Sequence, residues 1–110
     1  MDTIIVKVGK KYSFLKKDDI KWIESDNGYL KIHIEDKYHL LLMTLKDFEE
    51  KLNSENFIRI SRSNIINVLM VSEMIDSDKS NDFKVIMNDN TTLKWGRRYR
   101  NNFPDLLLLK

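Results

Sequence analysis

The chain has 110 residues, the size of a single domain, and its formal net charge at pH 7 is +2. Hydrophobic residues make up 42% of the chain and charged residues 33%, which indicates a globular protein and excludes a disordered one. The sequence has no cysteine, which excludes disulfides and cysteine-ligated metals, and it has no apolar run near the roughly 18 residues of a membrane span, so we expect a cytoplasmic protein.

The first part of the chain predicts five short β-strands. Apolar and polar residues alternate there, which is typical of strands with one buried face. The predicted ranges are 4–8, 12–15, 20–23, 30–34 and 38–43, with a turn at residues 10–11 between the first two. The Asn27-Gly28 pair predicts a tight turn after the third strand. In that strand either Trp22 or Ile23 continues the buried face, and the pattern leaves both open.

An amphipathic helix is predicted over about residues 44–53. Thr44 can cap its first turn, and Asp47 follows three residues later. Leu45, Phe48 and Leu52 fall on one face of such a helix. We expect that face to be buried.

The second half of the chain predicts strands over residues 57–60, 71–75, 83–87 and 91–95, with a short helical turn over 65–67. Residues 76–82 are polar and predict a loose loop. A final short helix is expected over 97–103, because Pro104 cannot continue it. The whole pattern predicts a mostly β (α+β) fold of short antiparallel strands, with one clear helix and a short C-terminal helix.

Residues suited to catalysis or metal binding are scarce. His33 and His39 lie on predicted strands without a carboxylate or second histidine at ligand spacing, so we expect surface or hairpin residues rather than ligands. Ser61 and Ser63 have no identifiable base, and the chain has no glycine-rich phosphate loop. We therefore expect that the protein is not an enzyme and that it binds neither a metal ion nor a cofactor.

A polar cluster at residues 59–64 interrupts the strand pattern, in the half of the chain that carries all five arginines. It can be an ordinary turn with solvated charges. Alternatively it is a loop that presents Arg62 and Asn64 to base edges while Ser63 holds a phosphate. Arginine can pair bidentately with guanine, and asparagine with adenine.

A second cluster, at residues 94–100, contains four basic and two aromatic side chains. If a helix begins after Gly96, Arg97 and Arg98 lie in its first turn, where the helix dipole disfavours cations. That arrangement is favourable when the helix end faces an anion. A solvated basic helix remains the alternative.

The order of four motifs resembles the LytTR family of DNA-binding domains. Residues 57–67 (FIRISRSNIIN) resemble the family signature F-x-R-x-H-R-S-x-x-V-N, and residues 18–30 (DDIKWIESDNGYL) resemble its opening segment. MTLKDFEEKL resembles its T-L-x-x-L-E-x-x-L helix, and LKWGRRYRNNF its closing R-R-Y element. The matches cover about residues 4–103, the expected core of one domain spanning residues 1–110.

The resemblance implies an elongated fold of several small β-sheets that places loops into successive major grooves of duplex DNA. By position, Arg62 and Arg98 would read bases, and the hairpin tip with Asn27 and Tyr29 would make a third contact. The phosphate contacts would come from Ser63, Lys94, Arg97 and Arg100. Two departures from the family pattern are Ser61, where a histidine is usual, and Gly96, where a serine is common.

The resemblance also implies a bacterial transcriptional regulator, the output domain of a two-component response regulator. Family members usually carry an N-terminal receiver domain, and here the pattern begins almost at once. We expect either an excised C-terminal domain or a stand-alone regulator. In isolation it should be a monomer or weak dimer that binds direct-repeat sites as two copies.

Two other functions remain open. A β-rich protein-interaction or small-ligand module would use the apolar residues 106–109 or exposed strand edges. Those residues are either a last strand on the core or a patch that meets a receiver domain. A single-stranded nucleic-acid binder would stack bases on Tyr29, Trp95 and Tyr99.

Overall fold

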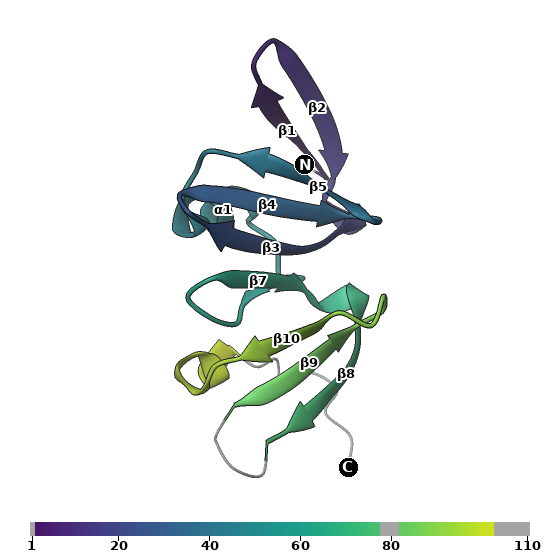
Figure 1. Cartoon of the computed structure of the whole chain (residues 1–110), viewed down its shortest axis with the longest axis vertical. Helices are drawn as coiled ribbons and strands as arrows, with labels where there is room; N and C mark the ends of the chain where they lie inside the picture. Colours follow the sequence, from purple (N-terminus) through teal and green to yellow (C-terminus); the bar gives the residue numbers. More distant parts are fainter. Residues whose placement is uncertain (1, 78–81, 103–110) are drawn as a thin grey trace.

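The computed structural model describes residues 2–77 and 82–102. The molecule is elongated, with extents of 48 × 28 × 25 Å, and three antiparallel sheets follow one another along its long axis (Figure 1). The elongated, mostly β fold expected from the sequence is therefore confirmed. Within these ranges no helix has the length and apolar character needed to cross a membrane.

The first sheet is a two-stranded hairpin of β1 (Thr3–Val8) and β2 (Lys11–Lys16). The turn predicted at residues 10–11 lies one residue earlier, because Gly9 adopts a φ of 63° that glycine tolerates best. Val6 and Leu15 on the inner face are buried, so the hairpin is anchored to the core.

The second sheet has five strands in the order β5-β4-β3-β7-β6. Its strands are β3 (Ile20–Asp26), β4 (Tyr29–Ile34), β5 (Lys37–Leu41), β6 (Phe57–Arg59) and β7 (Asn64–Asn67). A short 3₁₀ turn, Lys17–Asp19, leads into β3. The register of β3 shifts between Ile20 and Trp22. This irregularity, together with cores on both sides of the strand, buries both Trp22 and Ile23. The sequence left open which of the two is buried, and the structure shows that both are.

The helical turn predicted over residues 65–67 is wrong, because this segment is β7. Ile65 pairs with Ile23 of β3 and with Arg59 of β6, and Ile66 continues both ladders. Ile65 belongs to one core cluster and Ile66 to the other, so the strand is apolar on both faces. A short apolar run of that kind does not distinguish strand from helix by periodicity. The turn comes next, as a 3₁₀ helix over Val68–Met70.

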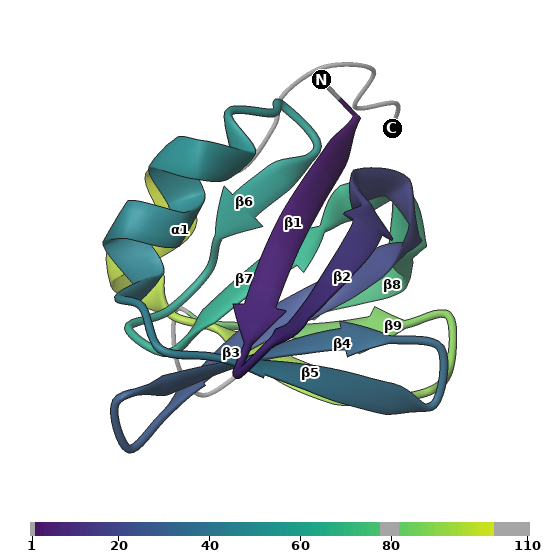
Figure 2. The same ribbon diagram turned by 90° about the horizontal axis from the view of Figure 1, so that it is seen from above.

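The predicted amphipathic helix is confirmed as α1 (Leu45–Leu52), which lies beside β6 (Figure 2). Thr44 Oγ1 accepts a hydrogen bond from the Asp47 amide at 3.1 Å, so the N-terminal cap is the predicted one. Leu45, Phe48 and Leu52 are buried as expected.

The third sheet has the order β10-β9-β8, from β8 (Val71–Asp76), β9 (Phe83–Met87) and β10 (Thr92–Trp95). The final helix is a 3₁₀ helix, η3, over Arg97–Asn102. The predictions that concern Phe103, Pro104, residues 106–109 and most of the loop at 76–82 lie outside the described residues.

Two apolar clusters form the core. The first lies around α1, the hairpin and one face of the five-stranded sheet, and the second joins that sheet to the third sheet. Asn67 is the one fully buried polar side chain within the described ranges. Its Nδ2 donates to the Ile20 carbonyl at 2.8 Å, and its Oδ1 accepts from the Leu69 amide at 3.0 Å, so its side chain ties β3 to the Val68–Met70 turn.

Candidate nucleic-acid interface

Three loops from distant parts of the sequence lie along one side of the long axis, at the left in Figure 1. They are the β3–β4 turn, the β6–β7 loop, and the end of β10 with the start of η3. We call residues 26–29, 61–64 and 94–98 the three-loop face. It contains every base-reading residue expected from the sequence and three of the four expected phosphate contacts.

Backbone hydrogen bonds fix the loops relative to one another. The Ser25 amide donates to the Ser63 carbonyl at 2.8 Å, which joins the base of the β3–β4 turn to the β6–β7 loop. The Gly96 amide donates to the Ile60 carbonyl, also at 2.8 Å, which joins the β6–β7 loop to the start of η3. The three loops are therefore presented together by rigid strands.

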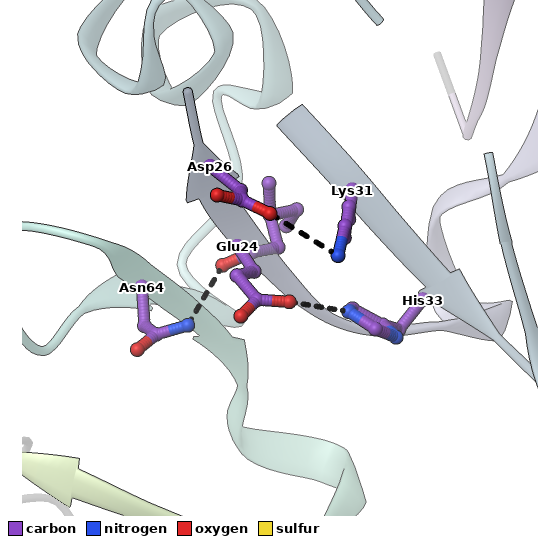
Figure 3. A network of polar contacts seen from close by, with 6 residues as sticks. Glu24, Asp26, Lys31, His33 and Asn64 are labelled. Carbon is purple, nitrogen blue, oxygen red and sulfur yellow. Dashed lines mark hydrogen bonds and ion pairs between the residues drawn. The ribbon is translucent and has the colours of Figure 1, made fainter. Parts of the chain in front are cut away.

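The β3–β4 turn has positive φ at both central residues, 51° at Asn27 and 86° at Gly28, as expected for a tight hairpin with this sequence. Asn27 and Tyr29 are both exposed. Behind them, Lys31 Nζ lies 3.3 Å from Asp26 Oδ2, and this contact raises the pKa of Lys31 (Figure 3).

Arg59 and Ser61 shape the β6–β7 loop. Arg59 donates from Nε to the Ser61 carbonyl at 2.7 Å and from Nη2 to the Arg62 carbonyl at 2.9 Å. Ser61 Oγ accepts from the amides of Ser63 and Asn64 at 3.2 and 3.0 Å. Arg59 was missing from the expected site, although it occupies a position of the signature motif. Ser61 stands where the family usually has histidine, and here its hydroxyl holds the turn.

Arg62 is exposed at the tip of this loop, and among residues 2–77 and 82–102 its guanidinium has no hydrogen-bond or ion-pair partner. Asn64 differs. Its Nδ2 donates to the Ile23 carbonyl at 3.4 Å (Figure 3). Its Oδ1 accepts from Ser61 Oγ at 3.4 Å. The structure thus uses the Asn64 amide to hold the loop against β3, and its expected base contact stays a prediction.

Asp82 organises the third loop and was not expected at the site. Its Oδ1 accepts from the Arg97 amide at 2.8 Å, and its Oδ2 lies 3.0 Å from Lys94 Nζ. Nothing in the polar segment 76–82 distinguishes this aspartate by sequence. Trp95, next to Lys94, is buried and donates from Nε1 to the Tyr99 carbonyl at 2.8 Å. Trp95 is therefore a core residue, which removes one of the three aromatics required for single-strand stacking.

A hollow of about 630 Å³ joins the two basic clusters. Its wall includes these residues: Ser61, Arg62, Ser63, Asn64, Asp82, Lys94, Gly96, Arg97, Arg98 and Tyr99. A neighbouring hollow of about 490 Å³ is lined by Gly28, Arg59 and Arg62 among others, so Arg62 lies between the two. Four cationic side chains line the first hollow with one carboxylate, a balance that favours an anionic ligand.

Arg100 is the expected site residue that lies outside the three-loop face. Its guanidinium carbon is 3.8 Å from the centre of the Phe83 ring, and its Nη2 is 3.5 Å from Asp76 Oδ1. These contacts place Arg100 on the third sheet, where it contributes to packing. Its phosphate contact stays a prediction.

The expectation that no carboxylate lies near His33 is wrong. Cross-strand pairing brings Glu24 Oε1 within 3.2 Å of His33 Nε2 (Figure 3). The imidazole stacks on Trp22 with ring centroids 4.4 Å apart. Burial lowers the pKa of His33, and the Glu24 hydrogen bond opposes that shift. Burial also lowers the pKa of His39. Across residues 2–77 and 82–102, no group of three His, Cys, Asp or Glu side chains could hold a metal ion.

The chain is similar to known proteins in sequence and in fold. The sequence profile of the LytTr DNA-binding domain matches residues 10–108. The transcriptional regulatory protein LytR of Staphylococcus aureus (strain N315) is 30% identical over 98 residues, which cover 89% of this chain and 39% of LytR. The sensory transduction protein LytT of Bacillus subtilis (strain 168) is 25% identical over 104 residues, which cover 94% of this chain and 43% of LytT. The chain thus spans about two fifths of the length of these relatives.

The same fold occurs in a solved structure, the LytTr DNA-binding domain of a methyl-accepting/DNA response regulator from Bacillus cereus. The TM-score is 0.80 at 19% sequence identity, and the match covers 93% of this chain and 96% of that one. At this identity the likeness concerns the fold.

Proposed function

The chain belongs to the LytTr DNA-binding domain family, and we propose that it regulates transcription by binding duplex DNA through the three-loop face. The observation that carries this proposal is the shared hollow. Arg62 and Arg98, which come from two distant sequence clusters, both line it. Strands and backbone hydrogen bonds hold these clusters in place, so little ordering is needed when DNA binds.

In the proposed mode of binding, the loops enter the major groove, and no recognition helix is used. The exposed guanidinium groups of Arg62 and Arg98 would pair bidentately with guanine, and the tip at Asn27 and Tyr29 would reach a further base step. Arg59 acts as a positioning residue, because its two hydrogen bonds fix the backbone on either side of the Arg62 side chain.

Phosphate contacts would orient the protein on the duplex. Ser63, Lys94 and Arg97 are exposed on the same face and suit that role. Such contacts carry little sequence information, so we expect them to set affinity and salt dependence.

The relatives are longer proteins, and we propose that this domain acts as the output part of a response regulator, with a receiver domain preceding it in the parent protein. Its place would be the cytoplasm, and it would have no enzymatic activity. In isolation the domain would be a monomer or weak dimer, and two copies of it would bind a direct-repeat site.

The salt dependence of duplex binding tests this proposal. A fluorescence anisotropy titration at several salt concentrations should give a slope of log K against log salt near −4 to −5, because about four to six phosphates would be neutralised. A slope near zero, or tighter binding of the corresponding single strand, would contradict the proposal.

A further inference from the structure

The β1–β2 hairpin has an outer face that the proposed DNA-binding function does not use. Successive side chains of a strand point to opposite faces, so alternate cross-strand pairs share one face. On the outer face these pairs are Thr3 with Lys16, Ile5 with Phe14, and Lys7 with Tyr12. Val6 and Leu15 lie on the inner face and are buried.

The centre of the outer face is apolar and exposed. Phe14 is 70% exposed and Ile5 56%, and the two are directly opposite each other in the ladder. Tyr12, the next residue on the same face of β2, is 58% exposed. Contiguous apolar surface of this kind, surrounded by polar groups, marks interaction sites on soluble proteins.

Within the hairpin itself, every charged side chain is basic. Residues 3–16 contain four lysines and no carboxylate: Lys7, Lys10, Lys11 and Lys16. Lys7 and Lys16 lie on the outer face itself, and Lys7 Nζ is 5.4 Å from the centre of the Tyr12 ring. The face therefore combines an apolar centre with a cationic rim.

We infer that the outer face of the hairpin docks an acidic protein surface with apolar side chains at its centre. A second copy of this chain is disfavoured, because lysines would meet lysines. DNA phosphates would pair with the lysines but leave Phe14 and Ile5 in water. An acidic partner with an apolar centre satisfies both parts of the surface, as interfaces with a desolvated core and a polar rim do.

This inference is independent of the DNA-binding proposal. None of the hairpin residues belongs to the three-loop face, and the hairpin lies at one end of the long axis, above the five-stranded sheet (Figure 1). A partner on the hairpin and DNA on the loops would therefore occupy different surfaces.

A synthetic amphipathic peptide tests the inference, with glutamates along one side and leucine and phenylalanine along the other. Titration into the isotope-labelled chain, followed by NMR, should shift the amide signals of residues 3–16. Phe14→Ser should weaken the peptide at least about fivefold, as expected for a central interface residue. Leu69→Ser is the matched control, because Leu69 is 58% exposed but lies in the Val68–Met70 turn, and it should leave the affinity within about twofold.

Several outcomes would overturn the inference. If Phe14→Ser and Leu69→Ser weaken peptide binding equally, the hairpin is excluded as the docking surface. Peptide-induced NMR shifts confined to the three-loop face would exclude it as well. Equal binding of a peptide with glutamines in place of glutamates would remove the acidic requirement. A dimer in sedimentation that Phe14→Ser converts to monomer would identify a second copy as the occupant, and tighter hairpin binding to phosphatidylglycerol vesicles would identify a lipid surface. Because Phe14 is mostly exposed, Phe14→Ser should keep the wild-type melting temperature. Measuring that temperature shows whether the variant is folded in these tests.

Discussion

The backbone amide of Gly96 donates a hydrogen bond to the carbonyl oxygen of Ile60 across 2.8 Å. Ile60 lies at the start of the β6–β7 loop, and Gly96 lies between β10 and η3, so this bond joins the second sheet to the third. It brings the two arginine-bearing clusters together although residues 65–93 separate them in the sequence. The proposed function depends on this closeness of the two clusters in space.

Arg62→Ala should separate base reading from general DNA affinity. If the Arg62 guanidinium pairs with guanine, its loss should weaken a specific duplex by roughly 10- to 100-fold and leave non-specific duplex nearly unchanged. The Arg62 side chain is exposed, so the melting temperature should not change. Anisotropy titrations with both duplexes measure the two affinities, and unchanged binding of the specific duplex would show that Arg62 does not read bases.

Arg100→Ala provides the contrast. We expect it to weaken all duplexes about equally and to flatten the salt slope by about one unit, as for loss of one phosphate contact. Unlike Arg62, Arg100 contacts Phe83 and Asp76, so this variant should also have a lower melting temperature. A sequence-dependent loss of affinity would contradict the assignment to phosphate.

Asp82→Asn should tighten DNA binding. The carboxylate engages Lys94 Nζ and places a negative charge in the hollow, whereas an asparagine oxygen can still accept from the Arg97 amide. Removal of this charge should raise the affinity for non-specific duplex roughly three- to tenfold at 0.1 M salt and steepen the salt slope. Asp36→Asn, in the exposed β4–β5 turn, makes the same change in net charge and should have a smaller effect. Equal effects of both variants would show that only net charge matters.

Asn67→Ala should destabilise the fold by about 2–3 kcal/mol, because it leaves the Ile20 carbonyl and the Leu69 amide without their side-chain partner. Urea unfolding followed by circular dichroism gives the free energy. Asn101→Ala, on the exposed surface of η3, should change the stability by less than about 0.5 kcal/mol. A loss at Asn67 no larger than at Asn101 would mean that the buried amide is dispensable.

The ion pair between Lys21 and Asp89 predicts an acid-dependent loss of stability. Burial disfavours the charged Asp89 carboxylate, but hydrogen bonds from Lys21 and Thr91 outweigh it and lower the pKa of Asp89 from 3.8 to about 2. A group with a depressed pKa in the folded state stabilises the fold above its unfolded pKa, and that contribution is lost as the pH falls from about 4 to about 2. The difference in urea midpoint between wild type and Asp89→Asn should therefore be constant above pH 4 and shrink below it. A difference at pH 2 as large as that above pH 4 would exclude the carboxylate as its cause.

The features that the sequence predicts correctly depend on local patterns. The cap at Thr44 and the periodic apolar residues of α1 are determined within one segment, and so are the strand β9 and the turn at Asn27 and Gly28. The exposed position of Arg62 was predicted because a polar segment with arginine lies between apolar strands, and its role in base reading stays a prediction.

The features that the sequence misses depend on tertiary pairing. Ile65 and Ile66 form a strand because each faces a different core, and no local pattern shows that two cores exist. His33 meets Glu24 only through the β3–β4 register. Asp82 reaches the site because the third sheet brings it beside Lys94, so its role could not be read from a polar loop sequence.

The central claim is that duplex DNA binds the three-loop face. The most direct measurement is an NMR titration of the isotope-labelled chain with duplex DNA, in which each backbone amide reports its own environment. The account predicts that the largest shifts fall within residues 26–29, 61–64 and 94–98, with little change in the β1–β2 hairpin. Shifts concentrated in the hairpin or in the β4–β5 turn, with the three loops unchanged, would contradict it.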